Sequence, residues 1–500
     1  MRSPARRRAA CPVLILVSTL GLAAGRAPAS LPAAIASRVD AVFAEWDRRD
    51  TPGCALAVSQ GGKIVYQRGY GMASLIYGAR ITPETIFPVG SNSKQFTAMS
   101  IALLIEDAKL ALGDDIRKYL PEMPDYGRDY GRDKGRPITI DHLIHHTSGL
   151  RDYQALRFLA GIPPSQIDPQ QIFALIARQR HLNFQPGEKF AYSNSGYVLL
   201  RLIVERVSGQ SLADFAAERI FKPLGMTHTR WTEDPTRVMP NLATTHQGDR
   251  TIGFHTTVPA TMMGSGGIWT TLGDFFRWDE NFYHNRLGKG RPELIDQVLT
   301  PGKLADGSAV PYGFGLFLDQ YQGRKIVWHA GLGPGHVADV VRFPHEHLSV
   351  FCLCNGIIDS RRLSRQVADV FLGESESSSD QRAKRADRVK RANPAKDAED
   401  PRADSAAPAP EAAALASYAG RYASDELAAT YLLALEGGRL RVRTTVQPNG
   451  DLVYLGADRF LFPTQWFTFQ LDFFRDEKGE IAGFTLGSEE AQGFRFVKVP

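Results

Sequence analysis

The sequence predicts an α+β fold: an antiparallel sheet flanked by helices, a helical region inserted between its strands, and a small all-β C-terminal domain. Apolar residues alternate on both sides of Gly61-Gly62 over residues 54–70, which predicts a β-hairpin. Three runs rich in Val and Ile predict later strands at 325–329, 336–343 and 348–354. Mostly helical sequence separates the two groups, so we expect both ends of one domain to build a shared sheet.

Residues 1–29 have the pattern of a secretory signal peptide. An arginine-rich start precedes an apolar stretch from residue 12 to about residue 24, and Ala27-Pro28-Ala29 resembles a cleavage site. The stretch is short for a membrane span, which leaves a retained anchor as the alternative. No later segment offers about 18 uninterrupted apolar residues. We therefore expect an exported protein, periplasmic or secreted, with no integral membrane span once the signal is removed.

A serine and a lysine three residues apart precede a long apolar run that predicts a helix over residues 96–112. On a helix, Ser91 and Lys94 share one face, so the ammonium can lie beside the hydroxyl. A serine hydroxyl is a weak nucleophile at neutral pH unless a nearby base and positive charge help it lose its proton. The backbone N–H groups at the helix start also suit an oxyanion. The pair therefore indicates acyl transfer, and the alternative is that Ser91 only caps the helix.

Two further motifs strengthen this hypothesis. Tyr192-Ser193-Asn194 stands in a polar segment just before an apolar helix expected over residues 197–207, and Trp328-His329-Ala330-Gly331 ends a strand before a glycine-rich turn. Together with segments 143–150 and 264–267, these motifs resemble the serine β-lactamase and penicillin-binding-protein family, in its class C-like branch of D,D-carboxypeptidases, D-aminopeptidases and esterases. The resemblance covers about residues 31–372, which we take as the catalytic domain.

The resemblance implies a role for each motif residue. Ser91 would attack the substrate carbonyl and form an acyl-enzyme, and Lys94 would ease its deprotonation. Tyr192 would be the base, either as a phenolate held by positive charge or by relaying a proton in concert with Lys94. Asn194 would hold Lys94 and the substrate amide. The oxyanion and substrate site would use the backbone N–H groups of Ser91 and Leu332, with His329 and Gly331 on the same strand. The alternative is that Tyr192 and His329 have structural roles only, as packed side chains.

The third motif departs from the family pattern. Many members have Lys-Thr-Gly where this chain has His329-Ala330-Gly331. Ala330 has no hydroxyl to bind the carboxylate of a β-lactam or a D-alanyl terminus, which argues against efficient β-lactam hydrolysis and strict carboxypeptidase action. An unperturbed histidine has a pKa of about 6.5, so we expect the charge of His329 to change across the working pH range.

Two segments near these motifs are expected to be structural. His145 and His146 would support the wall of the site, and residues 264–267, Gly-Ser-Gly-Gly, would allow close backbone packing beside it.

Removal of the signal peptide would leave three cysteines, Cys54, Cys352 and Cys354. An odd number cannot form a disulfide framework, so we expect buried structural thiols. Cys352 and Cys354 alternate on a strand and share a face, which leaves a metal site or a bridge to Cys54 as alternatives.

Residues 373–411 are rich in Ser, then in Lys and Arg, and then in Ala and Pro. Such a composition buries too little apolar surface to fold alone, so we expect a disordered linker, with envelope binding as the alternative. Residues 412–500 show short strand patterns separated by Gly-containing turns, which predicts a small barrel, lipocalin-like in form. The aromatic residues of segment 466–474 are expected to fill it.

Composition excludes several classes of function. With 43% hydrophobic and 23% charged residues the chain is globular, and its net charge of +5 comes partly from the N-terminus and the linker, so no nucleic-acid surface is expected. No zinc-protease helix, Gly-x-Ser-x-Gly elbow or dinucleotide loop occurs, and no cofactor or metal is implied.

The sequence therefore predicts an exported serine hydrolase that acts through an acyl-enzyme on small peptide or amide substrates that contain D-amino acids, as an aminopeptidase or a carboxypeptidase. A carboxylesterase or weak β-lactamase is the alternative within the family. A catalytically silent protein that binds envelope peptides is the alternative of another class. The oligomeric state is not predicted.

Overall fold

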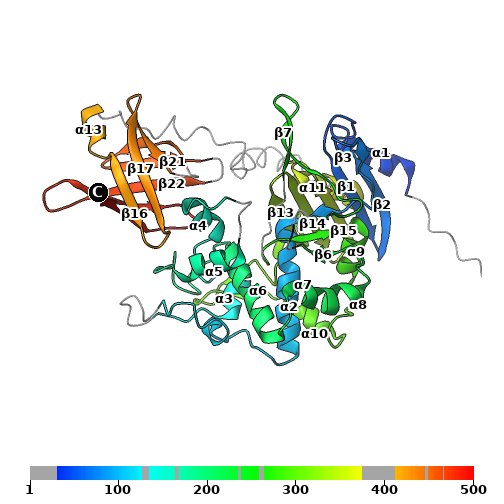
Figure 1. Ribbon diagram of the computed structural model, residues 1–500. Helices are drawn as coiled ribbons and strands as arrows, with labels where there is room; N and C mark the ends of the chain where they lie inside the picture. Colours follow the sequence, from blue (N-terminus) through cyan, green and yellow to red (C-terminus); the bar gives the residue numbers. More distant parts are fainter. Residues whose placement is uncertain are drawn as a thin grey trace, which may run out of the picture.

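The computed structural model describes residues 31–126, 135–163, 168–232, 234, 238–257, 264–373, 412–444, 449–464 and 467–500. They form a large body of sheet and helices and a smaller C-terminal β-domain, which lies beside helices α4 (Tyr153–Leu159) and α5 (Pro169–Ala177) (Figure 1). The expected signal peptide and, apart from Gly373, the expected linker lie outside the described residues.

A six-stranded antiparallel sheet forms the centre of the large body. Its order is β12 (Phe317–Tyr321), β13 (Arg324–Gly333), β14 (His336–Phe343), β15 (Leu348–Cys354), β1 (Cys54–Gln60) and β2 (Lys63–Tyr70). The N-terminal hairpin therefore pairs with the last strand of the domain, as the sequence predicts. Strand β12 was not predicted, because it is a partly exposed edge strand with no clear alternation.

Alternate residues of the central strands face two hydrophobic cores. Leu56 and Val58 pack with α1 (Ala33–Val42) and α11 (Ser360–Leu372) on one face of the sheet. Ala55 and Ala57 face the helices of the inserted region on the other. Both faces are thus covered, which explains why β14 and β15 are buried along their whole length.

The inserted region is mainly helical. The helices predicted over residues 96–112 and 197–207 are present as α2 (Lys94–Glu106) and α6 (Asn194–Ser208), and α5 lies between them in the chain. Helix α2 is shorter than predicted and lies at the centre of the region, where its first eleven residues are buried. Helix α6 begins earlier than predicted, so Asn194 stands in its first turn. The remaining helices are α3 (Ile140–Ile144), α4, α7 (Leu212–Ala216), α8 (Lys222–Leu224), α9 (Leu272–Glu280) and α10 (Pro292–Val298).

Short strands form four small sheets around the central sheet and these helices. One three-stranded sheet has the order β5 (Phe87–Pro88), β9 (Ile268–Thr270) and β6 (Arg230–Trp231). The backbone N–H of Val89 donates to the Ile268 carbonyl at 3.1 Å, which anchors the chain just before Ser91. The two-stranded sheets are β3 (Met72–Ser74) with β4 (Ala79–Arg80), β7 (Thr245–Asp249) with β8 (Gly253–Thr257), and β10 (Gly302–Lys303) with β11 (Ala309–Val310).

The C-terminal domain is a nine-stranded antiparallel sheet that curls into a nearly closed barrel, preceded by α13 (Ala412–Ala416). Its interior holds buried aromatic side chains such as Phe469, Phe473 and Phe484. Trp466 lies outside the described residues, and Phe467 contacts Phe158 of α4 instead, with ring centres 5.5 Å apart. The strand order is β19 (Gly450–Asp451), β18 (Arg439–Arg443), β17 (Ala429–Glu436), β16 (Gly420–Ser424), β24 (Phe494–Val499), β23 (Ile481–Gly487), β22 (Thr468–Arg475), β21 (Arg459–Pro463) and β20 (Val453–Gly456).

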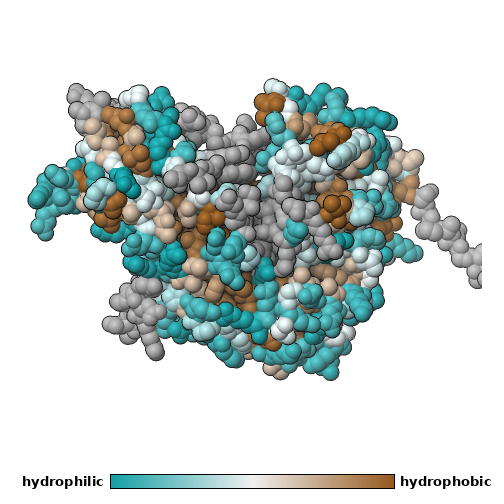
Figure 2. All heavy atoms as spheres, viewed as in Figure 1, coloured by the Kyte–Doolittle hydropathy of each residue, from teal (hydrophilic) through white to brown (hydrophobic). Residues whose placement is uncertain are grey.

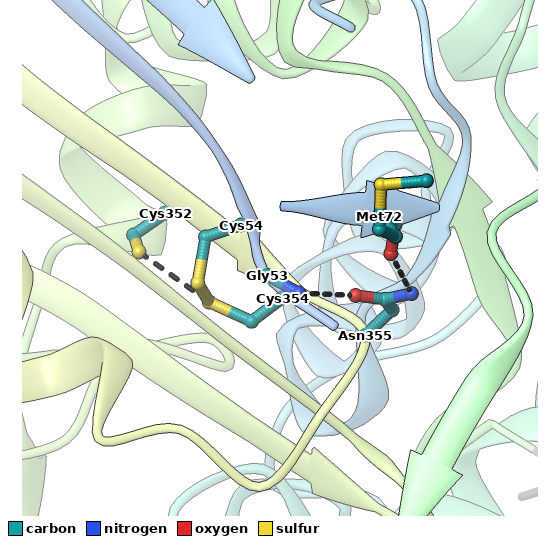
Figure 3. The surroundings of a disulfide bond; sticks show 6 residues. All are labelled: Gly53, Cys54, Met72, Cys352, Cys354 and Asn355. Carbon is teal, nitrogen blue, oxygen red and sulfur yellow. Dashed lines mark hydrogen bonds between the residues drawn. A yellow bond between two sulfur atoms is a disulfide. The ribbon is translucent and has the colours of Figure 1, made fainter. Parts of the chain in front are cut away.

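The prediction of three structural thiols was wrong, and the alternative of a bridge to Cys54 is confirmed. Cys54 and Cys354 lie directly opposite each other on β1 and β15 and form a disulfide (Figure 3). Cys352 remains a buried free thiol, with its Sγ 3.7 Å from that of Cys354. The three sulfurs lie within 4.8 Å of one another, but the disulfide leaves one thiol, too few to hold a metal ion. The pairing depends on the register of strands 300 residues apart, which a cysteine count cannot reveal.

Beside the disulfide, the buried Asn355 ties three segments together. Its Oδ1 accepts a hydrogen bond from the backbone N–H of Gly53 at 2.9 Å, and its Nδ2 donates to the Met72 carbonyl at 3.0 Å (Figure 3). The end of β15 is thereby joined to the start of β1 and to β3.

The surface is mainly polar on the face shown in Figure 2, where apolar residues form separate patches on both domains. Among the residues that the structure describes, no helix is both long and apolar enough to cross a membrane.

Candidate active site

Ser91 stands in a tight turn, η1 (Gly90–Ser93), immediately before α2. Ser93 fixes the turn, because its Oγ donates to the Gly90 carbonyl at 2.7 Å and accepts from the backbone N–H of Ile268 at 3.0 Å. Gly90 has φ +51°, and a Cβ there would lie 2.8 Å from the Leu332 nitrogen. A glycine is therefore required for the turn to approach β13. The turn presents a partly exposed Ser91 at the start of a buried helix.

Lys94 is fully buried and donates three hydrogen bonds from Nζ. They reach Ser91 Oγ at 3.1 Å, Asn194 Oδ1 at 2.8 Å and the Ser265 carbonyl at 2.8 Å. Burial lowers the pKa of Lys94 to about 7, although the charge of Asp152 opposes that shift. Near neutral pH, a large fraction of Lys94 is therefore the free amine, which can accept the proton of Ser91.

Tyr192 joins this pair from the loop before α6. Lys94 Nζ lies 4.9 Å from the centre of its ring, and its hydroxyl is hydrogen-bonded to Ser91. Burial raises the pKa of Tyr192 far above its usual value, and the hydrogen bond to Ser91 offsets only part of this shift. Tyr192 is therefore a neutral phenol at neutral pH. Of the two roles implied by the sequence, the structure favours proton relay with Lys94 over a standing phenolate.

Asp152 completes the network and was missed by the sequence analysis. Its Oδ2 accepts from Nδ2 of Asn194 at 3.0 Å and from the Asn194 backbone N–H, which turns Asn194 Oδ1 toward Lys94. Burial raises the pKa of Asp152, with the N–H donors and Lys94 acting against that shift. Its position just before α4 signals an N-cap, a role it also has through Gln154. That signal does not reveal a partner 42 residues away.

His329 is placed beside the site, but the prediction that its charge changes across working pH was wrong. Its Nδ1 lies 2.6 Å from the Ala330 carbonyl, which can only accept, so Nδ1 carries the proton. Nε2 then accepts from the Tyr312 hydroxyl at 3.0 Å. Burial, and next the charge of Lys94, lower the pKa of His329 to about 3. His329 therefore stays neutral at any working pH.

The two expected oxyanion donors lie on adjacent segments. Strand β12 pairs with β13 only as far as Trp328, so the following residues of β13 leave one edge open toward the Ser91 turn. Gly331 is pressed against that turn, since a Cβ there would lie 1.9 Å from the Val89 carbonyl oxygen. The backbone N–H groups of Ser91 and Leu332 are thus brought together, and their role as an oxyanion hole stays a prediction.

An aromatic wall surrounds Tyr192. The ring of His146 lies 4.3 Å from that of Tyr192, and its Nδ1 accepts from the Ser193 backbone N–H at 3.1 Å. His145 pairs instead with Asp141 at 3.0 Å, so both histidines have the structural contacts expected of them.

The 264–267 segment packs closely, as predicted. A Cβ on Gly264 would lie 2.6 Å from the Tyr197 carbonyl oxygen. The next carbonyl, that of Ser265, is the one that accepts from Lys94.

Comparison with known proteins identifies the family. Residues 38–373 match the family described as Beta-lactamase. The D-aminopeptidase of Brucella canis is 32% identical over 309 residues, which are 61% of this chain and 56% of that protein. This chain therefore spans little more than half the length of that relative.

Solved structures show the same fold. The octameric penicillin-binding protein homologue from Pyrococcus abyssi superposes with a TM-score of 0.58 at 22% identity, covering 93% of this chain and 99% of that chain. A D-amino acid amidase from Ochrobactrum anthropi SV3, solved with L-phenylalanine amide, gives 0.55 at 21% identity, covering 68% of this chain and 98% of that chain. The family match covers most of this chain, and it coincides with the residues that build the Ser91 site. The chain therefore belongs to the β-lactamase family of serine hydrolases.

Proposed function

We propose that the protein hydrolyses small peptides or amides that contain D-amino acids, through an acyl-enzyme formed on Ser91. The observation that carries this proposal is the 3.1 Å contact between Lys94 Nζ and Ser91 Oγ, made by a fully buried lysine. A free amine at this position is a base within hydrogen-bonding reach of the nucleophile.

Acylation follows from the contacts around this pair. Ser91 Oγ attacks the carbonyl carbon while its proton passes to Lys94, directly or through Tyr192, and the N–H groups of Ser91 and Leu332 face the oxyanion. When the C–N bond breaks, the hydroxyl of Tyr192 gives the departing amine its proton, and the Lys94 ammonium restores that proton to Tyr192. Water then releases the acid from Ser91 by the reverse transfers.

The third motif supports the substrate class. His329 is neutral, and Ala330 has no hydroxyl, so neither side chain supplies a cation or a hydroxyl for a substrate carboxylate. The absence of these groups disfavours β-lactams and peptides that are recognised through their free C-terminal carboxylate. It leaves amides and peptides that are cleaved at their N-terminal residue. The preference for D-amino acids is supported by the names of two similar proteins, a D-aminopeptidase and a D-amino acid amidase. An ester substrate also needs no carboxylate contact, which makes a carboxylesterase the second candidate.

The test is covalent labelling of Ser91 with a fluorophosphonate, followed by a substrate panel. We expect wild type to be labelled and Ser91→Ala to be unlabelled. D-aminoacyl amides should then be turned over faster than their L forms, acyl-D-alanyl peptides and a chromogenic cephalosporin. Turnover of short esters without amides would assign the esterase function. An unlabelled wild-type protein would favour a silent peptide-binding protein and refute the hydrolase.

We also propose that the protein acts outside the cytoplasm. The Cys54–Cys354 disulfide supports this location, because such bonds persist in oxidising compartments. Expression with and without residues 1–29, followed by fractionation and mass measurement, tests it. Cleavage near residue 29 and recovery outside the cytoplasm are expected, and retention of the uncleaved chain in the cytoplasm would contradict the proposal.

A further inference from the structure

The C-terminal domain contacts the helical region directly beside the Lys94 network. Two of its loops make these contacts: residues 425–428 join β16 to β17 and contribute Glu426, and residues 488–493 join β23 to β24 and contribute Glu490. Both loops meet the chain around Arg151 and Asp152, just before α4.

Glu426 forms a buried ion pair with Arg151. Their side chains are 8% and 1% exposed, and Nη1 of Arg151 lies 3.0 Å from Oε1 of Glu426. The same oxygen accepts from the backbone N–H of Arg180 at 2.7 Å, and the guanidinium lies 4.3 Å from the centre of the Phe494 ring. A buried cation needs its partner, because an unpaired charge away from water is very unfavourable.

The contacts continue from Arg151 to the catalytic lysine. The carbonyl of Arg151 accepts from Ser195 Oγ in the first turn of α6 at 2.6 Å. The N–H of the next residue, Asp152, donates to the Glu490 carbonyl of the C-terminal domain at 3.0 Å. The carboxylate of Asp152 holds Asn194, which in turn accepts from Lys94. The side chains of Glu426, Arg151, Asp152, Asn194 and Lys94 are all buried or partly buried, Arg151 and Asp152 are consecutive in the chain, and Glu490 contributes its backbone carbonyl from an exposed position.

We propose that the C-terminal domain positions the catalytic lysine: Glu426 and the 488–493 loop fix Arg151 and Asp152, so that Asp152 and Asn194 hold Lys94 against Ser91. This inference rests on the proposed function, since it assigns a role in the reaction at Ser91. Glu426 does not touch the reacting atoms and is a positioning residue. A shift of about 1 Å in such a network costs on the order of a hundredfold in rate, so the pair matters for activity as well as for folding.

The test compares Glu426→Gln with Glu436→Gln in the full-length protein. Glu436 is a matched control, because it pairs with Arg443 at 2.6 Å in the same domain but is exposed to solvent. For Glu426→Gln we expect kcat to fall about ten- to a hundredfold with KM within about twofold. The acid limb of the kcat profile should move to higher pH as water reaches Lys94. The titratable groups that face Lys94 are Asp152, Tyr192, His146, His329 and Tyr197. Glu436→Gln should match wild type.

Asn183→Ala provides a second variant, and it removes two hydrogen bonds that are exposed to solvent. Its side chain bridges the same loop, donating to the Glu490 carbonyl and accepting from the Gln492 N–H, both at 3.0 Å. A several-fold loss of kcat with the same shift of the acid limb is expected. If Glu426→Gln does not fold, the kcat and pH profile of Asn183→Ala test the inference instead. The inference would be overturned if the folded variants had a lower melting temperature but the same kcat and the same acid limb of the pH profile as wild type. Failure of wild type to label at Ser91 would instead refute the proposed function.

Discussion

The two domains bury polar groups in different ways. In the catalytic domain, buried and partly buried polar side chains gather around Lys94 and hydrogen-bond to one another, as Asn194 does with Asp152. In the described part of the C-terminal domain, the buried polar or charged residues are Ser424 and Glu426. Aromatic rings fill the interior. Burial of polar groups is unfavourable unless they have hydrogen-bond partners. A cluster of such groups therefore indicates a functional site, whereas an apolar interior indicates a domain with a structural role. Glu426 is the exception that links them.

The largest expected effect is the loss of the buried amine. Lys94→Met keeps much of the side-chain volume and removes the base, so kcat/KM should fall about a thousandfold. Lys118→Met, at an exposed ion pair of the same domain, should remain near wild type. Steady-state kinetics with a D-aminoacyl amide checks this prediction. A fall of less than about tenfold in Lys94→Met would mean that the polar cluster is not catalytic.

Removal of the phenol tests the relay within the same cluster. Tyr192→Phe preserves the ring contact with His146 but removes the hydroxyl that is hydrogen-bonded to Ser91. We therefore expect kcat to fall about a hundredfold. Amides should suffer more than activated esters, because an amine leaving group needs the proton. Equal losses on both substrates would argue that Tyr192 only packs.

The disulfide tests whether stability and chemistry are separate. Cys54 lies in the core between the sheet, α1 and α11, which does not include Lys94. Cys54→Ser should therefore lower the free energy of unfolding by about 2 to 5 kcal/mol in urea titrations, with kcat retained in the folded protein. Cys352→Ala, which removes the free thiol without burying a hydroxyl, should lower it by only about 1 kcal/mol. Similar losses in both variants would contradict the assigned pairing.

The smallest expected effect concerns His329. Burial holds its pKa at about 3, so it carries no charge that changes between about pH 5 and 8. His329→Gln should thus lower kcat only several-fold, through loss of the contact with Tyr312, and should leave the acid limb in place. A limb that disappears in this variant would restore the titrating role that the sequence suggested.

Local spacing accounts for the parts of the site that the sequence predicted. The three-residue interval from Ser91 to Lys94 and the Tyr192-Ser193-Asn194 motif before α6 are short-range patterns, and the strands around Gly61-Gly62 follow from alternation. The layered sheet and the separate β-domain could be predicted for the same reason.

The features that were missed, or left open as alternatives, depend on contacts between distant segments. Asp152 is an N-cap by position, and only the fold brings it to Asn194. The Cys54–Cys354 bond depends on strand register, and the neutral state of His329 depends on burial, neither of which is visible in composition. The Arg151–Glu426 pair joins two domains and has no local signal.

The most direct test of the central claim is the rate of Ser91 acylation against pH, measured by single-turnover kinetics. Burial lowers the pKa of Lys94 to about 7, and only the free amine accepts a proton. The rate should therefore fall about tenfold per pH unit below pH 7 and level off above it. A rate that does not change between about pH 5 and 9 would contradict the assignment of Lys94 as the base.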